Sequence, residues 1–173
     1  MPKLPFGDKG PVQVVWDYGG TPLILNPVLG TVSLTTTDSV SDVQEEGWGE
    51  TPVDAVFTGT VVELQVPMAR SALQQLIDLL EGVESGAGPC TAIFKAKAGC
   101  AMYENAKQVV LKPLCDNEPD ADTCTWILLY KCFPYRTFEL GFDREGQRVH
   151  MVVFKVFVNQ DSGYKGKLYQ YGV

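Results

Sequence analysis

The side chains suited to acid–base or nucleophilic chemistry are few in this sequence, and their spacing indicates no catalytic site. The one histidine, His150, opens an apolar strand, where we expect a hydrogen-bonded structural residue. No second imidazole exists for a metal site, and no serine or cysteine lies in a recognisable nucleophile motif. Carboxylates are abundant, but they fall in turns and loops, where no apolar pocket would distinguish an acid from a base. We therefore expect a protein that is not an enzyme.

The turn Cys115–Asp122 carries acids at alternate positions, a pattern that invites comparison with calcium loops. The acids are Asp116, Glu118, Asp120 and Asp122. A helix-loop-helix calcium site also needs a central glycine and a distant bidentate glutamate, and this turn has neither. Because acid-rich turns mostly face solvent, we expect no specific metal, and no cofactor is indicated.

The five cysteines are odd in number and never occur as Cys-x-x-Cys. Neither a full disulfide framework nor a zinc knuckle is therefore indicated, and we expect free, reduced thiols. Cys115 and Cys124 flank the acidic turn and would lie on adjacent strands if the turn closes a hairpin. Whether these two pair is left open.

The net charge of −7 is unevenly distributed along the chain. Residues 1–90 carry twelve acids against three bases, whereas residues 91–173 carry nine acids against eleven bases. No basic residue lies between Lys9 and Arg70. Such a distribution favours association between copies of the chain, acidic surface against basic surface, although a solvated acidic loop is the alternative.

Composition excludes two other classes of protein. The chain is acidic and its lysines are scattered singly, so a basic nucleic-acid-binding patch is poorly supported. No apolar run approaches the roughly 20 residues of a membrane helix, and residues 1–10 lack the apolar centre of a secretory signal. We expect no membrane partner and a protein that is made and used without crossing a membrane.

The run Val53–Gly82 predicts a strand that leads directly into the only convincing helix. Val56, Val62, Leu64 and Val66 alternate on one face of a strand that Pro67 is expected to end. From Ala69 onward apolar residues recur at helical spacing, and Gly82 is placed to end the helix in a left-handed conformation. The stripe of this helix must lie on a sheet.

The rest of the sequence predicts a single, mainly β domain over residues 1–173, a β-sandwich or barrel with one flanking α-helix. Thr123–Phe133 is apolar on both faces and should be central. The segment Cys90–Tyr103 is left open between strand and helix. The other expected strands are Val12–Tyr18, Thr21–Asn26, Val28–Thr37, Ala106–Leu114, Thr137–Phe142 and Arg148–Asn159, the last two joined by a turn at Asp143–Gly146.

Three segments are expected to lie outside this core: an N-terminal arm at about 1–11, an acidic loop at about 38–52 and a C-terminal arm at about 161–173. The loop Asp38–Pro52 is near the upper limit for compact domains unless it has a function. Trp48 would anchor it on a partner, or would pack back on its own domain. The candidate inter-subunit contacts are Asp38, Asp42, Glu45, Glu46, Trp48 and Glu50.

The layout of the chain resembles the bacteriophage tail tube, or major tail, proteins. The resemblance rests on an order of elements: two strands, a long acidic loop, the strand Ala55–Val66, Pro-Met, the helix Ala69–Gly82 and a β-rich second half. It implies a structural virion protein of the viral tail that assembles in the bacterial host cytoplasm. Its partners would be further copies of itself and other phage tail proteins.

The resemblance also implies an architecture for the assembly. Subunits would form stacked, hexameric rings around a hollow conduit for DNA ejection, and genomic DNA would pass through an acidic lumen without specific binding. Loop 38–52 would reach a neighbouring subunit or ring, and the arms would link successive rings. The five cysteines and the turn between Cys115 and Cys124 depart from the family pattern.

Two alternatives share the same composition. One is another virion β-sandwich protein, such as a tail terminator or head–tail adaptor, which would form a single closed ring. The other is a monomeric β-sandwich ligand-binding module that uses Trp48 and the tyrosine-rich C-terminus to bind a carbohydrate or peptide.

Overall fold

The computed structural model describes residues 11–25, 31–48, 50–69, 73–88, 91–96, 98–99, 101–115, 118–136 and 149–173. Within these ranges the chain is mainly β with one α-helix, so the predicted fold class is confirmed. The elements are β1 (Val12–Trp16), β2 (Leu23–Leu25), β3 (Ser33–Gln44), β4 (Pro52–Ala69), α1 (Leu73–Leu79), β5 (Val83–Ser85), β6 (Ala92–Phe94), β7 (Lys107–Cys115), β8 (Glu118–Pro119), β9 (Ile127–Arg136), β10 (Val149–Val156) and β11 (Tyr169–Tyr171).

Nine strands form one antiparallel sheet whose main path runs β2-β1-β7-β9-β10-β4-β3. β11 adds to this sheet beside β9, and β8 adds beside β7. β5 and β6 form a separate two-stranded ribbon. The expectation that the apolar Thr123–Phe133 region is central is confirmed, because β9 lies between β7 and β10.

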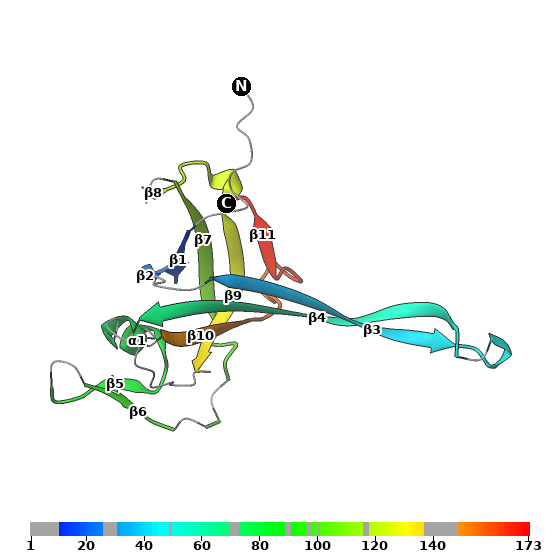
Figure 1. Cartoon of the computed structure of the whole chain (residues 1–173), viewed down its shortest axis with the longest axis horizontal. Helices are drawn as coiled ribbons and strands as arrows, with labels where there is room; N and C mark the ends of the chain where they lie inside the picture. The colour runs from blue at the N-terminus through cyan, green and yellow to red at the C-terminus, as the bar shows by residue number, and fades with distance from the viewer. Residues whose placement is uncertain are drawn as a thin grey trace, which may run out of the picture.

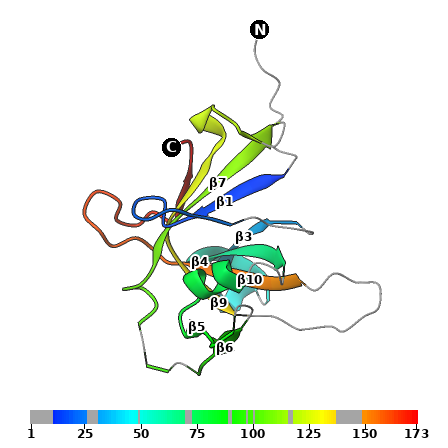
Figure 2. The ribbon, with the colours of Figure 1, turned by 90° about the vertical axis from the view of Figure 1, so that its left-hand side faces the viewer.

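β9 belongs to both halves of the large sheet. Near its start Leu129 pairs with Val109 of β7 and with Tyr169 of β11, and further along Phe133 pairs with Lys155 of β10. Figure 1 shows β7, β9 and β11 running across the direction of β3, β4 and β10. Figure 2 shows the two halves around a shared interior. The sheet therefore folds over itself as an open barrel or sandwich.

The main core lies between these halves, and α1 closes it. On β4 the predicted face is confirmed for Val62, Leu64 and Val66, each of which is fully buried. Leu76 and Leu79 of α1 join the same cluster. The other members of the cluster include Val14, Trp16, Leu25, Val109, Leu111, Leu129, Val152, Phe154 and Val156.

Pro67 does not end its strand, contrary to the prediction. β4 continues to Ala69 and pairs with β10 from Val62 to Ala69, Pro67 opposite Met151. The physical reason is that β3 begins opposite Gln65, so β4 has no β3 residue beside Pro67 that would require an N–H donor. The helix is correspondingly shorter than expected and spans Leu73–Leu79, with residues 70–72 outside the described ranges. Gly82 adopts a φ of 78°, the left-handed conformation that was predicted.

The C-terminal segment is part of the sheet and not an arm. Tyr169–Tyr171 forms β11 against β9, and the backbone N–H of Val173 donates to the carbonyl oxygen of Thr123 at 3.1 Å. The prediction of an arm at 161–173 is therefore wrong. Its cause is that β11 finds its partner about 40 residues earlier in the chain, a pairing that leaves no local pattern.

Other expectations fall partly or wholly outside the described residues. These are the N-terminal arm up to residue 10, the strand Thr137–Phe142 and the turn Asp143–Gly146. Part of the undecided segment Cys90–Tyr103 is a strand, since Ala92–Phe94 forms β6. Over the part of the chain that the structure describes, no helix has the length and hydropathy needed to span a bilayer.

Two adjacent valines of β4 provide a test of the core. Val62 is fully buried, whereas Val61 is 48% exposed. We expect Val62→Ala to lower the free energy of unfolding by about 2 kcal/mol, because it removes buried methyl groups and leaves a cavity. Val61→Ala should change it by less than about 0.5 kcal/mol. Urea denaturation measures both, and equal losses would contradict this placement of the core.

Candidate functional site

The predicted acidic loop 38–52 is mostly a strand, so that prediction is wrong. β3 continues to Gln44 and pairs with β4 from Ser33 opposite Gln65 to Gln44 opposite Pro52. Only residues 45–51 connect the strands, and Glu46–Trp48 within them forms a 3-10 turn. The serines and aspartates of β3 carry no hydrophobic alternation, and cross-strand pairing with the β-branched residues of β4 overrides their weak strand propensity.

The β3–β4 hairpin extends well beyond the body of the protein. Figure 1 shows its far half reaching away from the other strands. All described residues within 35–61 are exposed, on both faces of the hairpin. This half of the hairpin lacks the support of a third strand or a packed face among the described residues. We therefore expect it to be only marginally stable in water, as isolated two-stranded ribbons are.

The candidate contact residues all lie on this projecting half. Asp38 and Asp42 lie on β3, and Glu45, Glu46, Trp48 and Glu50 lie in the connection. Trp48 is 69% exposed, so the structure does not pack it back on its own domain. Sequence reasoning thus placed these residues outside the core, while missing that a continuous hairpin presents them.

Sequence reasoning missed the apolar residues of the hairpin. Phe57 is 75% exposed. Val40, Val43, Val53, Val56 and Val61 are exposed as well. Monomeric soluble proteins rarely expose contiguous apolar surface of this kind unless it serves an interaction. Apolar residues alternate over residues 53–66 of the sequence, but this alternation does not predict which part of the strand extends beyond the core.

A β-bulge determines which side chains share a face of the hairpin. Ser39 pairs with Gly59 and Val40 with Phe57, which leaves Thr58 as the extra residue. Phe57 therefore lies on the face of Val40 and of the buried Val62, and Val56 lies on the opposite one. The prediction that Val56 shares a face with Val62 is wrong for this reason.

The charge of the hairpin has one sign. Between Asp38 and Asp54 there are six acids and no base. Asp38 accepts a hydrogen bond from the Thr60 hydroxyl at 2.6 Å, across the two strands. The hairpin thus combines exposed apolar residues with an acidic surround, a composition that a partner surface with apolar and basic groups would complement.

Lysines and aromatic rings meet on the outer face of β7 and β9. The ammonium of Lys112 lies 4.1 Å from the ring centroid of Trp126 and 5.2 Å from that of Tyr18. Lys167 lies 5.2 Å from the centroid of Tyr164. These lysines are scattered singly in the sequence. Their position beside the rings could not be predicted, because it results from antiparallel pairing of segments that are distant in the chain. Such contacts stabilise a cation by about 0.5–2 kcal/mol.

The acidic turn shapes the local backbone. Asp122 accepts a hydrogen bond from the N–H of Cys124 at 3.0 Å and caps a 3-10 turn over Thr123–Thr125. The indole N–H of Trp126 donates to the carbonyl oxygen of Asp120 at 2.9 Å. Asp116 lies outside the described residues. Within the described ranges, no group of three or more histidine, cysteine or acidic side chains is placed to hold a metal ion.

The side chains of Cys124 and Cys132 are described, and both are free thiols. Cys132 is fully buried, and this burial raises the pKa of its thiol. Cys124 is exposed, and its pKa is raised chiefly by a hydrogen bond to Asp122 and by the charge of that carboxylate. A raised pKa leaves less thiolate at neutral pH, so neither thiol has the environment of a nucleophile. His150, the other candidate, is buried on β10 opposite Met68.

Comparison with known proteins gives no further guide: no protein-family model matches the chain, and no curated protein matches it either. A function must therefore be inferred from the projecting hairpin and the charge distribution.

The environment of Cys124 predicts a change in its reactivity. Asp122→Asn keeps an oxygen that can accept from the Cys124 N–H but removes the negative charge that opposes thiolate formation. We expect iodoacetamide to alkylate Cys124 roughly threefold faster in this variant at pH 8, since the thiolate is the reactive form. Peptide mapping by mass spectrometry reads the rate at Cys124 alone. Asp161→Asn, which changes a carboxylate elsewhere, is the control, and an equal acceleration there would refute the assignment.

Proposed function

We propose that this protein is a structural subunit of a bacteriophage tail tube, which associates with copies of itself into stacked, hexameric rings that form the conduit for phage DNA. The observation that carries the proposal is the free half of the β3–β4 hairpin. Its exposed apolar residues, above all Phe57 and Trp48, have no cover within the described chain. The layout that resembles the tail tube proteins places a partner-reaching segment at this position.

The hairpin explains why association should continue beyond a dimer. The surface of the hairpin, with its acids and no base, differs from the lysine-bearing surface of the body, so a contact between the two is heterologous. Heterologous contacts generate closed rings where the rotation closes and open filaments where it does not. Rings that stack through such contacts form a tube.

Charge favours the same association. Six acids lie between Asp38 and Asp54, whereas bases outnumber acids in residues 91–173. The acidic surface of one copy therefore attracts the basic surface of another, which speeds their encounter and fixes their orientation. In the tube the surplus of acids would repel the phosphates of DNA, so that DNA slides through without adhering. The localisation that follows is the tail of the virion.

Removing the free half of the hairpin tests whether it drives assembly. Asp38 and Thr60 are paired across the strands, so residues 39–59 can be replaced by Asn-Gly, which favours a two-residue hairpin turn. Every described residue removed is exposed, so the shortened protein should still fold and show a cooperative thermal unfolding transition by circular dichroism. We expect tubes from the full chain in negative-stain microscopy and monomers from the shortened one. Tubes from the shortened chain would refute the proposal, and single closed rings from the full chain would favour an adaptor or terminator.

A single side chain gives a finer test. We expect Phe57→Ser to weaken assembly at least about tenfold in critical concentration, because a buried aromatic anchor at an interface contributes more than about 1.4 kcal/mol. Phe94→Ser is the matched control, since Phe94 is 40% exposed on the separate β5–β6 ribbon. Sedimentation velocity over a concentration series measures both variants. An equal effect of the two substitutions would show that the hairpin is not the specific contact.

A further inference from the structure

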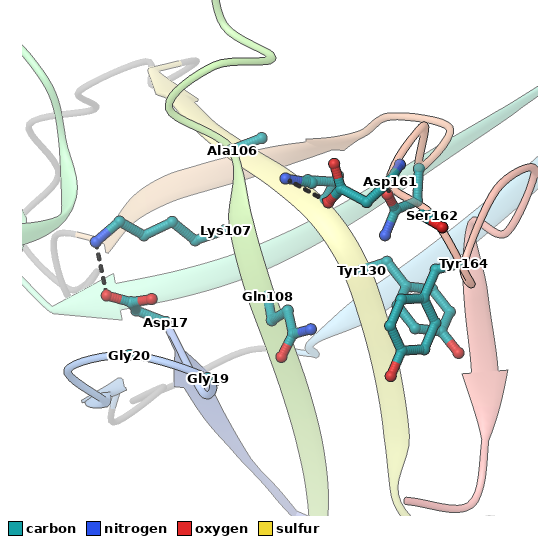
Figure 3. A pocket seen from close by; sticks show the side chains of 12 residues that line it. Asp17, Gly19, Gly20, Ala106, Lys107, Gln108, Tyr130, Asp161, Ser162 and Tyr164 are labelled. Carbon is teal, nitrogen blue, oxygen red and sulfur yellow. Dashed lines mark hydrogen bonds and ion pairs between the residues drawn. The ribbon is translucent and has the colours of Figure 1, made fainter.

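An open cavity with polar and apolar walls lies on the opposite side of β9 from the main core, away from the hairpin. Its volume is about 390 Å³. Four segments line it: the β1–β2 turn, the start of β7, the middle of β9 and residues 159–164. Figure 3 shows Gln108 of β7 and the neighbouring rings of Tyr130 and Tyr164 in front of the strands. The volume lies near the lower end of the roughly 300–1,000 Å³ of small-molecule sites.

The charged groups of this cavity neutralise one another. Lys107 Nζ lies 2.6 Å from Asp17 Oδ2, and Lys131 Nζ lies 3.0 Å from Asp161 Oδ2. Figure 3 shows the contact between Lys107 and Asp17 as a dashed line. Two cations and two anions leave no net charge to attract a phosphate or a metal ion. The cavity is therefore suited to a neutral ligand that forms many hydrogen bonds.

The β1–β2 turn is closely fitted to the cavity wall. Asp17 adopts a φ of 57°, a left-handed conformation that is uncommon outside glycine. A Cβ at Gly20 would lie 2.6 Å from the Asp17 carboxylate, and a Cβ at Gly19 would lie 2.9 Å from Gln108 Oε1. A side chain at Gly20 would therefore displace the Asp17 carboxylate, and one at Gly19 would displace the Gln108 amide. Backbone conformations of this kind gather at functional sites and turns.

The remaining lining groups supply donors, acceptors and one apolar surface. Asn159 lines the cavity and is 3% exposed, and its Oδ1 accepts from the Asp161 N–H at 2.8 Å. The rings of Tyr130 and Tyr164 lie 5.2 Å apart at 38°. Tyr130 also donates to Gln170, which fixes its ring. An aromatic wall beside amide, hydroxyl and charged groups offers stacking and hydrogen bonds together.

We propose that this cavity binds a neutral sugar, one pyranose unit of a saccharide. Each hydroxyl of a pyranose both donates and accepts hydrogen bonds, which matches a wall that carries carboxylates, ammonium groups and amides. The C–H face of the ring would pack on Tyr164, which is 47% exposed. The lining residues lie outside the hairpin, so the proposal stands independently of self-association.

The test uses methyl glycosides of glucose, galactose and N-acetylglucosamine, added to the full chain carrying Phe57→Ser. Saturation-transfer NMR and titration of amide shifts should detect at least one of them with a Kd of about 1 mM. Tyr164→Ala and Gln108→Ala should each weaken binding about tenfold. Tyr171→Ala is the matched control, because Tyr171 is 72% exposed and does not line the cavity.

Three outcomes would overturn the proposal. The first is that none of the three glycosides binds up to tens of millimolar, well above the expected Kd. The second is binding that Tyr164→Ala and Gln108→Ala leave unchanged, or that Tyr171→Ala weakens equally. The third is tighter binding of inorganic phosphate than of any glycoside, which would show that the cavity is not selective for neutral ligands.

Discussion

The register between β4 and β10 is the constraint on which the rest of the structure depends. Eight consecutive pairs, from Val62 opposite Val156 to Ala69 opposite Val149, hold β4 in the core. A slip of one residue would turn Leu64 and Val66 to the opposite face, so burial specifies this register strongly. Because β4 continues without interruption into the hairpin, the same register fixes the direction in which the hairpin projects and, through the bulge, the face that Phe57 occupies.

The free half of the hairpin is held from one end only. From Val62 to Gln65 β4 has two partners, β3 and β10, whereas from Val61 back to Pro52 the register leaves it with β3 alone. The cross-strand hydrogen bond between Thr60 and Asp38 lies just beyond this point and supports the start of the ribbon. A two-stranded ribbon gains its remaining stability from contact with another surface. The same segment is therefore weakly stable in a lone copy and well placed to be stabilised by a second one.

The core could be predicted from the sequence because the buried residues of a strand recur at every second position. Val62, Leu64 and Val66 alternate within five residues, and Val152, Phe154 and Val156 do the same on β10. The start of β3 lies within the predicted strand Val28–Thr37, but its continuation from Asp38 to Gln44 could not be predicted, since a strand exposed on both faces needs no hydrophobic alternation and its acids and serines are typical of loops. The cavity could not be predicted either: Asp17, Lys107 and Asp161 meet through pairing between segments about 50–140 residues apart, and each alone is an ordinary surface residue.

The lysines of the body help to distinguish a conduit for DNA from a DNA-binding protein. Several are already engaged within the chain: Lys95 with Glu84, Lys107 with Asp17 and Lys131 with Asp161, while Lys112 and Lys167 lie over aromatic rings. A phosphate would have to displace these partners to bind the same lysines. Counterion release, which drives nonspecific DNA binding, requires lysines that are free to neutralise phosphates. Engagement of the cations thus weakens adhesion to DNA, which suits the proposed subunit that encloses DNA without holding it.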